Sequence, residues 1–201
     1  DAANWGDGGG SVVECDGAGV PEDGDIIYFH NATMAANTLL TNDIPGLNVA
    51  GIESAGINTL PDLTIFGDLT VSDHITLTGG LGSENTLTLS GQITLGNNIT
   101  VGGEQGNLTF TNSVNTAGYN LAIDDIDVDF NGVISGNGGF SKAGVGQVTI
   151  LGNNTFTGGV TISGGTVLAR HLNALGTSAG GTTITDGGSL TYGGIGADNP
   201  T

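Results

Sequence analysis

The chain has 201 residues, of which 37 % are hydrophobic and 39 are glycine, and it carries two basic residues against 20 acidic ones. The formal net charge of −18 excludes nucleic acid and anionic bilayer surfaces as partners. The sequence has no run of about 20 apolar residues and no basic segment before an apolar one, so we expect no membrane insertion by this segment.

Residues 1–60 are expected to form an N-terminal cap and the first irregular rungs of a repetitive fold. Their apolar runs, 26–29 and 39–40, lack a regular period. Twelve of the 20 acidic residues lie in residues 1–75, and this acidic N-terminal part favours either solubility or binding of a divalent ion. The single cysteine, Cys15, cannot form an intramolecular disulfide, so it is a buried apolar residue, a free thiol or a cross-link to another chain.

Residues 61–201 are predicted to be a β-solenoid, because short units of apolar residue, threonine and apolar residue recur from residue 63 onward. Within a unit the two apolar side chains point to one face of a strand and the threonine points to the other. Units recur after 24 residues, which predicts an all-β parallel β-helix with three strands per rung of about 20–24 residues. The intervening Gly and Asn residues suit corners, and the apolar register disfavours a disordered glycine-rich chain. The units begin at Leu63, Leu69, Ile75, Leu87, Ile93, Ile99 and Leu108.

One segment of this repeat carries the candidate metal-binding residues Asp125, Asp127 and Asp129. Alternation places these carboxylates together on the outer face of one strand, with the intervening apolar residues inside. Ionised carboxylates at that spacing repel unless they are solvated or bridged by a cation. We therefore weigh a calcium site against a solvated acidic ladder, with calcium the sole cofactor that the sequence suggests.

The sequence offers little for catalysis. The three histidines, His30, His74 and His171, sit in unrelated contexts and are expected to be surface or corner residues rather than ligands or bases. Paired carboxylates for glycoside hydrolysis could be drawn from the three aspartates already named, but nothing else around them resembles a site. We predict a protein that is not an enzyme.

Residues 139–192 carry four motifs in a fixed order. This region resembles the autotransporter-associated β-strand repeat of passenger regions in bacterial autotransporters and related surface proteins. A weaker similarity to the start of such passengers comes from Asn4-Trp5 and Pro21-x-x-Gly24-Asp25-x-x-x-Phe29. The four motifs are Lys142-x-Gly144-x-Gly146-x-Val148, Gly152-Asn153-Asn154-Thr155-Phe156-Thr157-Gly158, Gly164-Gly165-Thr166-Val167-Leu168 and Asn173-Ala174-Leu175-Gly176.

The resemblance implies a right-handed parallel β-helix that is secreted or displayed on the bacterial cell surface, and it implies no catalytic residue. Two functions stay open: an adhesin scaffold that contacts cell-surface or matrix components, and a self-assembling filament or matrix subunit with head-to-tail contacts. The scarcity of Trp and Tyr favours a structural protein. The alternative is a carbohydrate-binding or polysaccharide-degrading β-helix.

Overall fold

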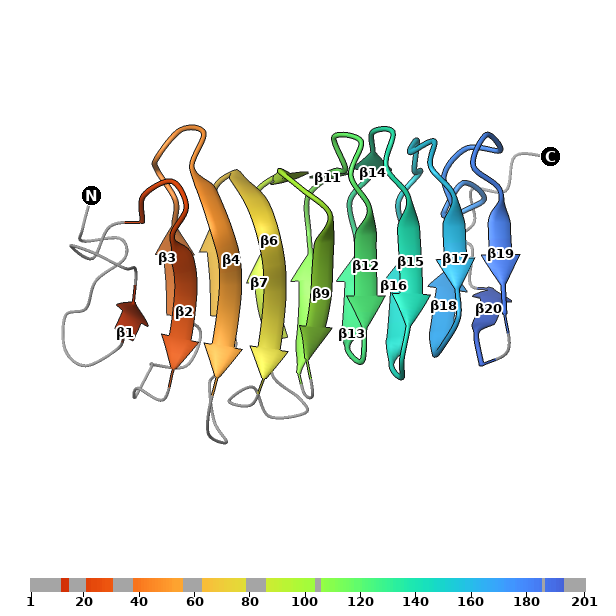
Figure 1. Ribbon diagram of the computed structural model, residues 1–201, viewed down its shortest axis with the longest axis horizontal. Coiled ribbons are helices and arrows are strands. Elements are labelled where there is room, and N and C mark those ends of the chain that lie inside the picture. The colour runs from red at the N-terminus through yellow and green to blue at the C-terminus, as the bar shows by residue number, and fades with distance from the viewer. Residues whose placement is uncertain are drawn as a thin grey trace.

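The computed structural model describes residues 12–14, 21–30, 38–55, 63–78, 86–103, 106–185 and 187–193. Within these ranges the regular structure consists of 20 β-strands, without a helix. The strands lie side by side along the long axis of an elongated molecule (Figure 1). Accordingly, no described segment is a helix of the length and hydrophobicity needed to cross a membrane.

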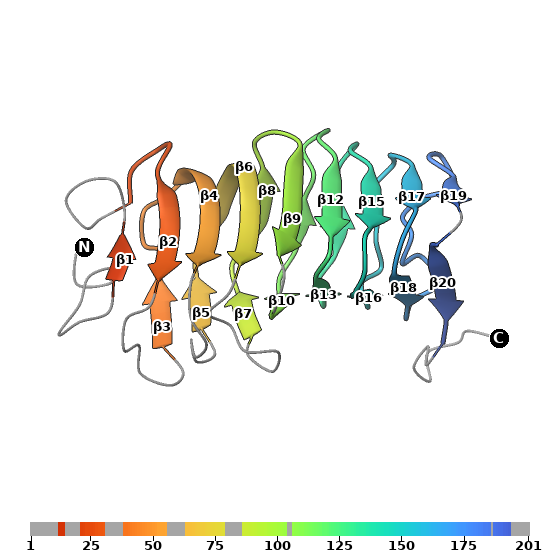
Figure 2. The ribbon, with the colours of Figure 1, turned by 60° about the horizontal axis from the view of Figure 1, so that its bottom comes forward.

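Two long sheets and one short ladder make up the three sides of the molecule. In Figure 2, strands of the second sheet lie beneath those of the first at both ends of the array. The first sheet contains, in hydrogen-bonding order, β1 (Val12–Glu14), β2 (Ile26–His30), β4 (Asn48–Ala55), β6 (Leu69–Thr78), β9 (Ile99–Gly103), β12 (Leu121–Asp124), β15 (Phe140–Ala143), β17 (Val160–Ile162) and β19 (Thr182–Ile184). The second sheet contains β3 (Thr38–Thr41), β5 (Leu63–Phe66), β7 (Thr86–Leu89), β10 (Asn107–Phe110), β13 (Asp127–Phe130), β16 (Gln147–Ile150), β18 (Thr166–Ala169) and β20 (Ser189–Tyr192).

The third side is a short ladder formed by the first part of β6 with β8 (Ile93–Leu95), β11 (Val114–Asn115) and β14 (Ile134–Ser135). Backbone hydrogen bonds continue this side beyond β14, where the Thr155 N–H donates to the Ile134 carbonyl (2.9 Å) and the Thr177 N–H donates to the Phe156 carbonyl (2.9 Å). All described strand pairs from β2 onward are parallel. The predicted all-β parallel solenoid with three strands per rung is therefore confirmed.

The interior is a column of aliphatic and phenylalanine side chains, as the alternation predicted. In β10, for example, Leu108 is 0 % exposed and Phe110 is 1 % exposed, whereas Thr109 between them is half-buried on the outer face. Register partners continue the column from rung to rung, so each rung buries its apolar face only against its neighbours. One such column contains Leu63, Leu87, Leu108, Val128, Val148 and Val167.

The rung length varies along the solenoid, and the pairing of β6 with β9 exceeds the predicted range of about 20–24 residues. Val71 pairs with Leu95, 24 residues on, but Ile75 pairs with Val101 rather than with Ile99. The reason is that β6 runs without a break past the third side, whereas the next rung turns at 96–98 between β8 and β9. This corner takes up two additional residues. Farther along, successive partners such as Leu108 and Val128 lie 20 residues apart.

The described part of residues 1–60 already belongs to the stacked strands. β2 pairs in parallel with β4, and β3 pairs in parallel with β5. β1 instead pairs antiparallel with β2 and covers the edge of the first sheet. The assignment of a cap to residues 1–60 stays a prediction, and Trp5 and Cys15 lie outside the described residues.

Candidate functional site

The acidic segment forms a corner between the two sheets. β12 ends at Asp124 and β13 begins at Asp127, and Asp125 between them has a φ of 52°. Asp127 and Asp129 point outward from β13 and are exposed, as expected. Asp125 does not share their strand face, so the expectation that all three carboxylates lie on one strand is wrong. An aspartate tolerates the left-handed conformation that this corner requires.

The carboxylates of this corner accept hydrogen bonds from the following rung. Asp125 Oδ1 accepts from the Val145 N–H (2.8 Å), and Asp127 Oδ1 accepts from the Gln147 N–H (2.6 Å). Asp68 Oδ1 does the same for the Gln92 N–H at another corner (2.7 Å). Carboxylate oxygens of one rung thus accept hydrogen bonds from corner N–H groups of the next rung. These N–H groups lie at the corners, where the carbonyls of a neighbouring strand do not pair with them.

No group of three or more His, Cys, Asp or Glu side chains in the described part of the chain is arranged to hold a metal ion. Asp125 and Asp127 each already use one carboxylate oxygen for a backbone N–H. Their remaining oxygens and the Asp129 carboxylate are the groups that could take part in calcium coordination. Calcium binding by Asp125, Asp127 and Asp129 stays a prediction.

Lys142 is a residue whose position sequence reasoning missed, because it was named only as the first residue of a repeat motif. It lies on β15 and is 0 % exposed. Its Nζ donates to the carbonyl oxygens of Ala143, Val145 (2.6 Å) and, at 3.4 Å, Gly144. Burial lowers the pKa of Lys142, while the charges of the acidic corner act to raise it. The alternation of inward and outward side chains could have indicated this inward position, since Lys142 lies two residues after the inward Phe140 on the same strand.

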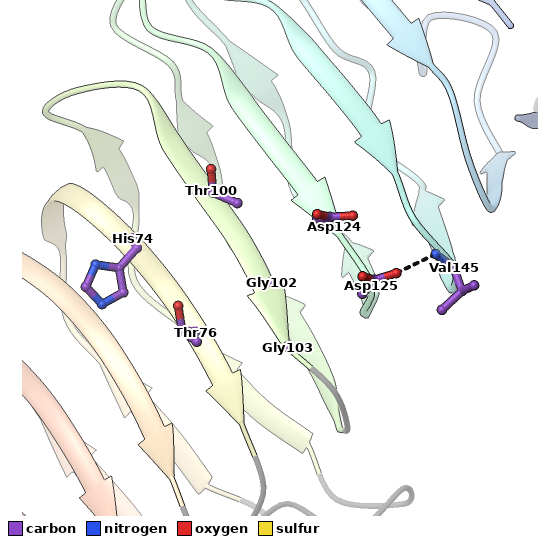
Figure 3. Close-up of a pocket in the computed structure, with 8 residues that line it drawn as sticks. All are labelled: His74, Thr76, Thr100, Gly102, Gly103, Asp124, Asp125 and Val145. Atoms are coloured by element: carbon purple, nitrogen blue, oxygen red, sulfur yellow. Dashed lines mark hydrogen bonds between the residues drawn. The ribbon is translucent and has the colours of Figure 1, made fainter.

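A hollow of about 510 Å³ lies on the outer face of the first sheet, and we call it the first-sheet hollow. Two adjacent glycines, Gly102 and Gly103, leave part of its surface without side chains, as Figure 3 shows. Hydroxyl groups and carboxylates surround them and can bond to hydroxyl or ammonium groups of a ligand. Its other lining residues are His74, Thr76, Thr100, Asp124, Asp125 and Val145.

His74, at the rim of the hollow, is held by two carboxylates. Its Nε2 lies 2.6 Å from Glu53 Oε1 on β4, and its Nδ1 lies 3.0 Å from Asp73 Oδ2. The ring covers Gly51, where a Cβ would lie 2.8 Å from the imidazole. His74 therefore links two rungs at the surface, with both nitrogens already engaged. His171 Nδ1 accepts from the Asn173 N–H within a turn (3.0 Å).

Comparison with known proteins gives one partial similarity. A stretch of 60 residues is 37 % identical to part of the adhesin BmaC autotransporter of Brucella suis biovar 1 (strain 1330), and it covers 30 % of this chain and 2 % of that protein. No family model matches the chain, and no solved structure matches it. The β-solenoid and this similarity fit a passenger-type β-helix. The assignment of residues 139–192 to the autotransporter-associated repeat stays a prediction.

Proposed function

We propose that this chain is part of an extracellular, surface-displayed or secreted bacterial β-helix that acts as an adhesin scaffold without catalysis. The observation that carries the proposal is the similarity to an adhesin autotransporter segment in a chain that folds as a parallel solenoid. A solenoid stacks rungs on their neighbours alone, so it extends a binding surface away from a cell without a globular core.

The charge of the chain supports an extracellular scaffold. With a formal net charge of −18, the surface resists nonspecific association and attracts basic rather than acidic partners. The proposal that the protein is not an enzyme is supported by His74, whose two ring nitrogens both face carboxylates and so are not placed to relay a proton to a ligand.

Carbohydrate binding is the second candidate function, and the first-sheet hollow favours it. Thr76, Thr100 and Asp124 present hydroxyl and carboxylate groups around the side-chain-free surface at Gly102. Such groups bind sugar hydroxyls, and the glycine surface leaves room for a ring. A scaffold with a glycan-binding surface would also act as an adhesin.

Attachment of the purified, fluorescently labelled chain to epithelial cells and to immobilised matrix proteins tests the adhesin proposal. The variant Gly102→Thr places a side chain in the hollow without a clash, since a Cβ at Gly102 meets only the Asp124 carbonyl at 3.4 Å. Ala122→Thr adds a similar side chain on β12 outside the residues that line the hollow and serves as the matched control.

We expect the wild-type chain and Ala122→Thr to attach equally. Loss of attachment in Gly102→Thr alone would place the contact at the hollow, and a glycan array with the same proteins would then test carbohydrate binding. Attachment of the wild type no greater than that of heat-unfolded chain would rule out the adhesin proposal.

Two partner proposals follow from the sequence and have their own tests. Head-to-tail self-association predicts a mass that rises with concentration in light scattering and filaments in negative-stain electron microscopy. Calcium binding by the acidic corner predicts uptake of calcium in equilibrium dialysis that the Asp129→Asn variant loses. A monomer at every concentration, or equal calcium uptake by the two proteins, would count against the respective proposal.

A further inference from the structure

Lys142 places an ammonium group in a column of the core that is otherwise aliphatic. Its register partners are Ile123 on β12 and Ile162 on β17, which are 1 % and 0 % exposed. Burying a cation in such surroundings is costly unless its N–H groups are bonded and its charge is balanced. Two different sets of groups meet these two needs.

The hydrogen-bond acceptors come from the same corner as the lysine. Nζ donates to the carbonyl oxygens of Ala143 and Val145, one and three residues along the chain. These carbonyls move with Lys142 if β15 slides along its neighbours. They satisfy the ammonium, but they cannot distinguish one stacking register from another.

The charges that act on Lys142 come from the preceding rung, at Asp124, Asp125 and Asp127. Two of these carboxylates also bind the corner of the lysine, because they accept the N–H groups of Val145 and Gln147. A slip of β15 by two residues keeps the inward and outward faces but moves Lys142 about 6.6 Å along the strand. The ammonium would then leave its counter-charges, and both N–H groups would lose their acceptors.

Aliphatic neighbours penalise such a slip much less. Ile123 and Ile162 resemble the apolar residues two positions away on the same strands, Leu121 and Val160, which are also buried. Burial of apolar area depends little on which of these residues meet.

We propose that Lys142 and the acidic corner of Asp124, Asp125 and Asp127 set the register in which β15 and β16 stack on β12 and β13. The ammonium group and the carboxylates belong to two successive rungs. The ammonium lies inside one corner, and the carboxylates lie at the equivalent corner of the preceding rung. The role is conformational and goes beyond the proposed adhesin function.

Hydrogen exchange at the Val145 and Gln147 amides tests this proposal, since in the observed register these N–H groups donate hydrogen bonds to Asp125 and Asp127, which should slow their exchange. Lys142→Met removes the charge and keeps an unbranched side chain that fits a core. We expect its exchange at these two amides to rise about tenfold or more relative to wild type, with smaller changes at β5 and β7.

Asp124→Asn and Asp129→Asn separate the charge effect from general loss of stability. Asp124 acts on Lys142, whereas Asp129, exposed on the neighbouring strand, is not among the charges that act on it. We expect faster exchange at the two amides in Asp124→Asn and an exchange rate equal to that of wild type in Asp129→Asn. In a Lys142→Met background, Asp124→Asn should cause no additional increase in the exchange rate.

Unchanged protection in Lys142→Met would overturn the proposal. Equal effects of Asp124→Asn and Asp129→Asn would overturn it as well, because a general response to lost charge would explain both. If Lys142→Met does not fold, the comparison of the two aspartate variants decides by itself.

Discussion

Phe110 and Phe130 stack face to face inside the solenoid, with ring centroids 4.8 Å apart and ring planes 3° apart. They are register partners on β10 and β13, and both are at most 1 % exposed. Equivalent positions on successive rungs thus place like side chains directly over one another. The Phe140 ring adds an edge-to-face contact with Phe130, with the ring planes at 85°.

Truncation of Phe130 should be among the most damaging single changes. Phe130→Ala removes a fully buried ring and its stacking contact with Phe110, so we expect a loss of about 3–5 kcal/mol in the free energy of unfolding. The matched control is Phe66→Ala, because Phe66 is 40 % exposed at the end of β5 and should cost under about 1.5 kcal/mol. Denaturant unfolding followed by circular dichroism measures both, and equal losses would contradict the stacked-core explanation.

Asn154 is expected to be essential for the third side of the solenoid. It is 2 % exposed, its Oδ1 accepts from the Ile134 N–H (2.7 Å), and its Nδ2 donates to the Ala174 carbonyl (2.6 Å). Asn154→Ala leaves two buried backbone groups unpaired, so we expect a loss of about 3 kcal/mol in stability. Its neighbour Asn153 is exposed, and Asn153→Ala should change stability by less than about 0.5 kcal/mol in the same unfolding experiment.

Glycine at the stacked corners should not tolerate a side chain. A Cβ at Gly158 would lie 2.3 Å from the Gly138 carbonyl oxygen of the preceding rung, and backbone cannot move aside without disturbing the ladder. We expect Gly158→Ala to lower stability by about 1–3 kcal/mol or more. Gly193→Ala is the control, since a Cβ there meets nothing within 4 Å. A thermal midpoint for Gly158→Ala equal to that of the control would refute the close stacking.

The pH dependence of stability should contain a contribution from Lys142. Burial lowers its pKa below the ordinary value of 10.5, although Asp124, Asp125 and Asp127 of the preceding corner oppose the shift. Between the lowered value and 10.5 the unfolded chain binds more protons than the folded chain, so this contribution to stability rises with pH. Across this pH window, the free energy of unfolding of wild type should therefore increase with pH relative to that of Lys142→Met. A constant difference would show that the pKa of Lys142 is not lowered.

Local sequence pattern was enough to predict the strands and the solenoid. Apolar residues two apart with threonine between them can bury one face only, and glycine and asparagine between the units permit sharp corners, so the chain has few alternatives to stacked rungs. The inward positions of Val128 and Phe130, and the outward positions of Asp127 and Asp129, followed directly from this alternation.

The tertiary structure decided what depends on contacts between rungs. The pairing of Ile75 with Val101 depends on whether a corner forms between two strands, which the spacing of the units does not reveal. The structure also placed Asp125 in a left-handed corner, turned Lys142 into the core and brought residues of β6, β9 and β12 together around the first-sheet hollow. Strand periodicity is a local property of the chain. The partners of a buried charge and the shape of an outer face depend on residues about 20 positions away, at a distance set by the turns between them.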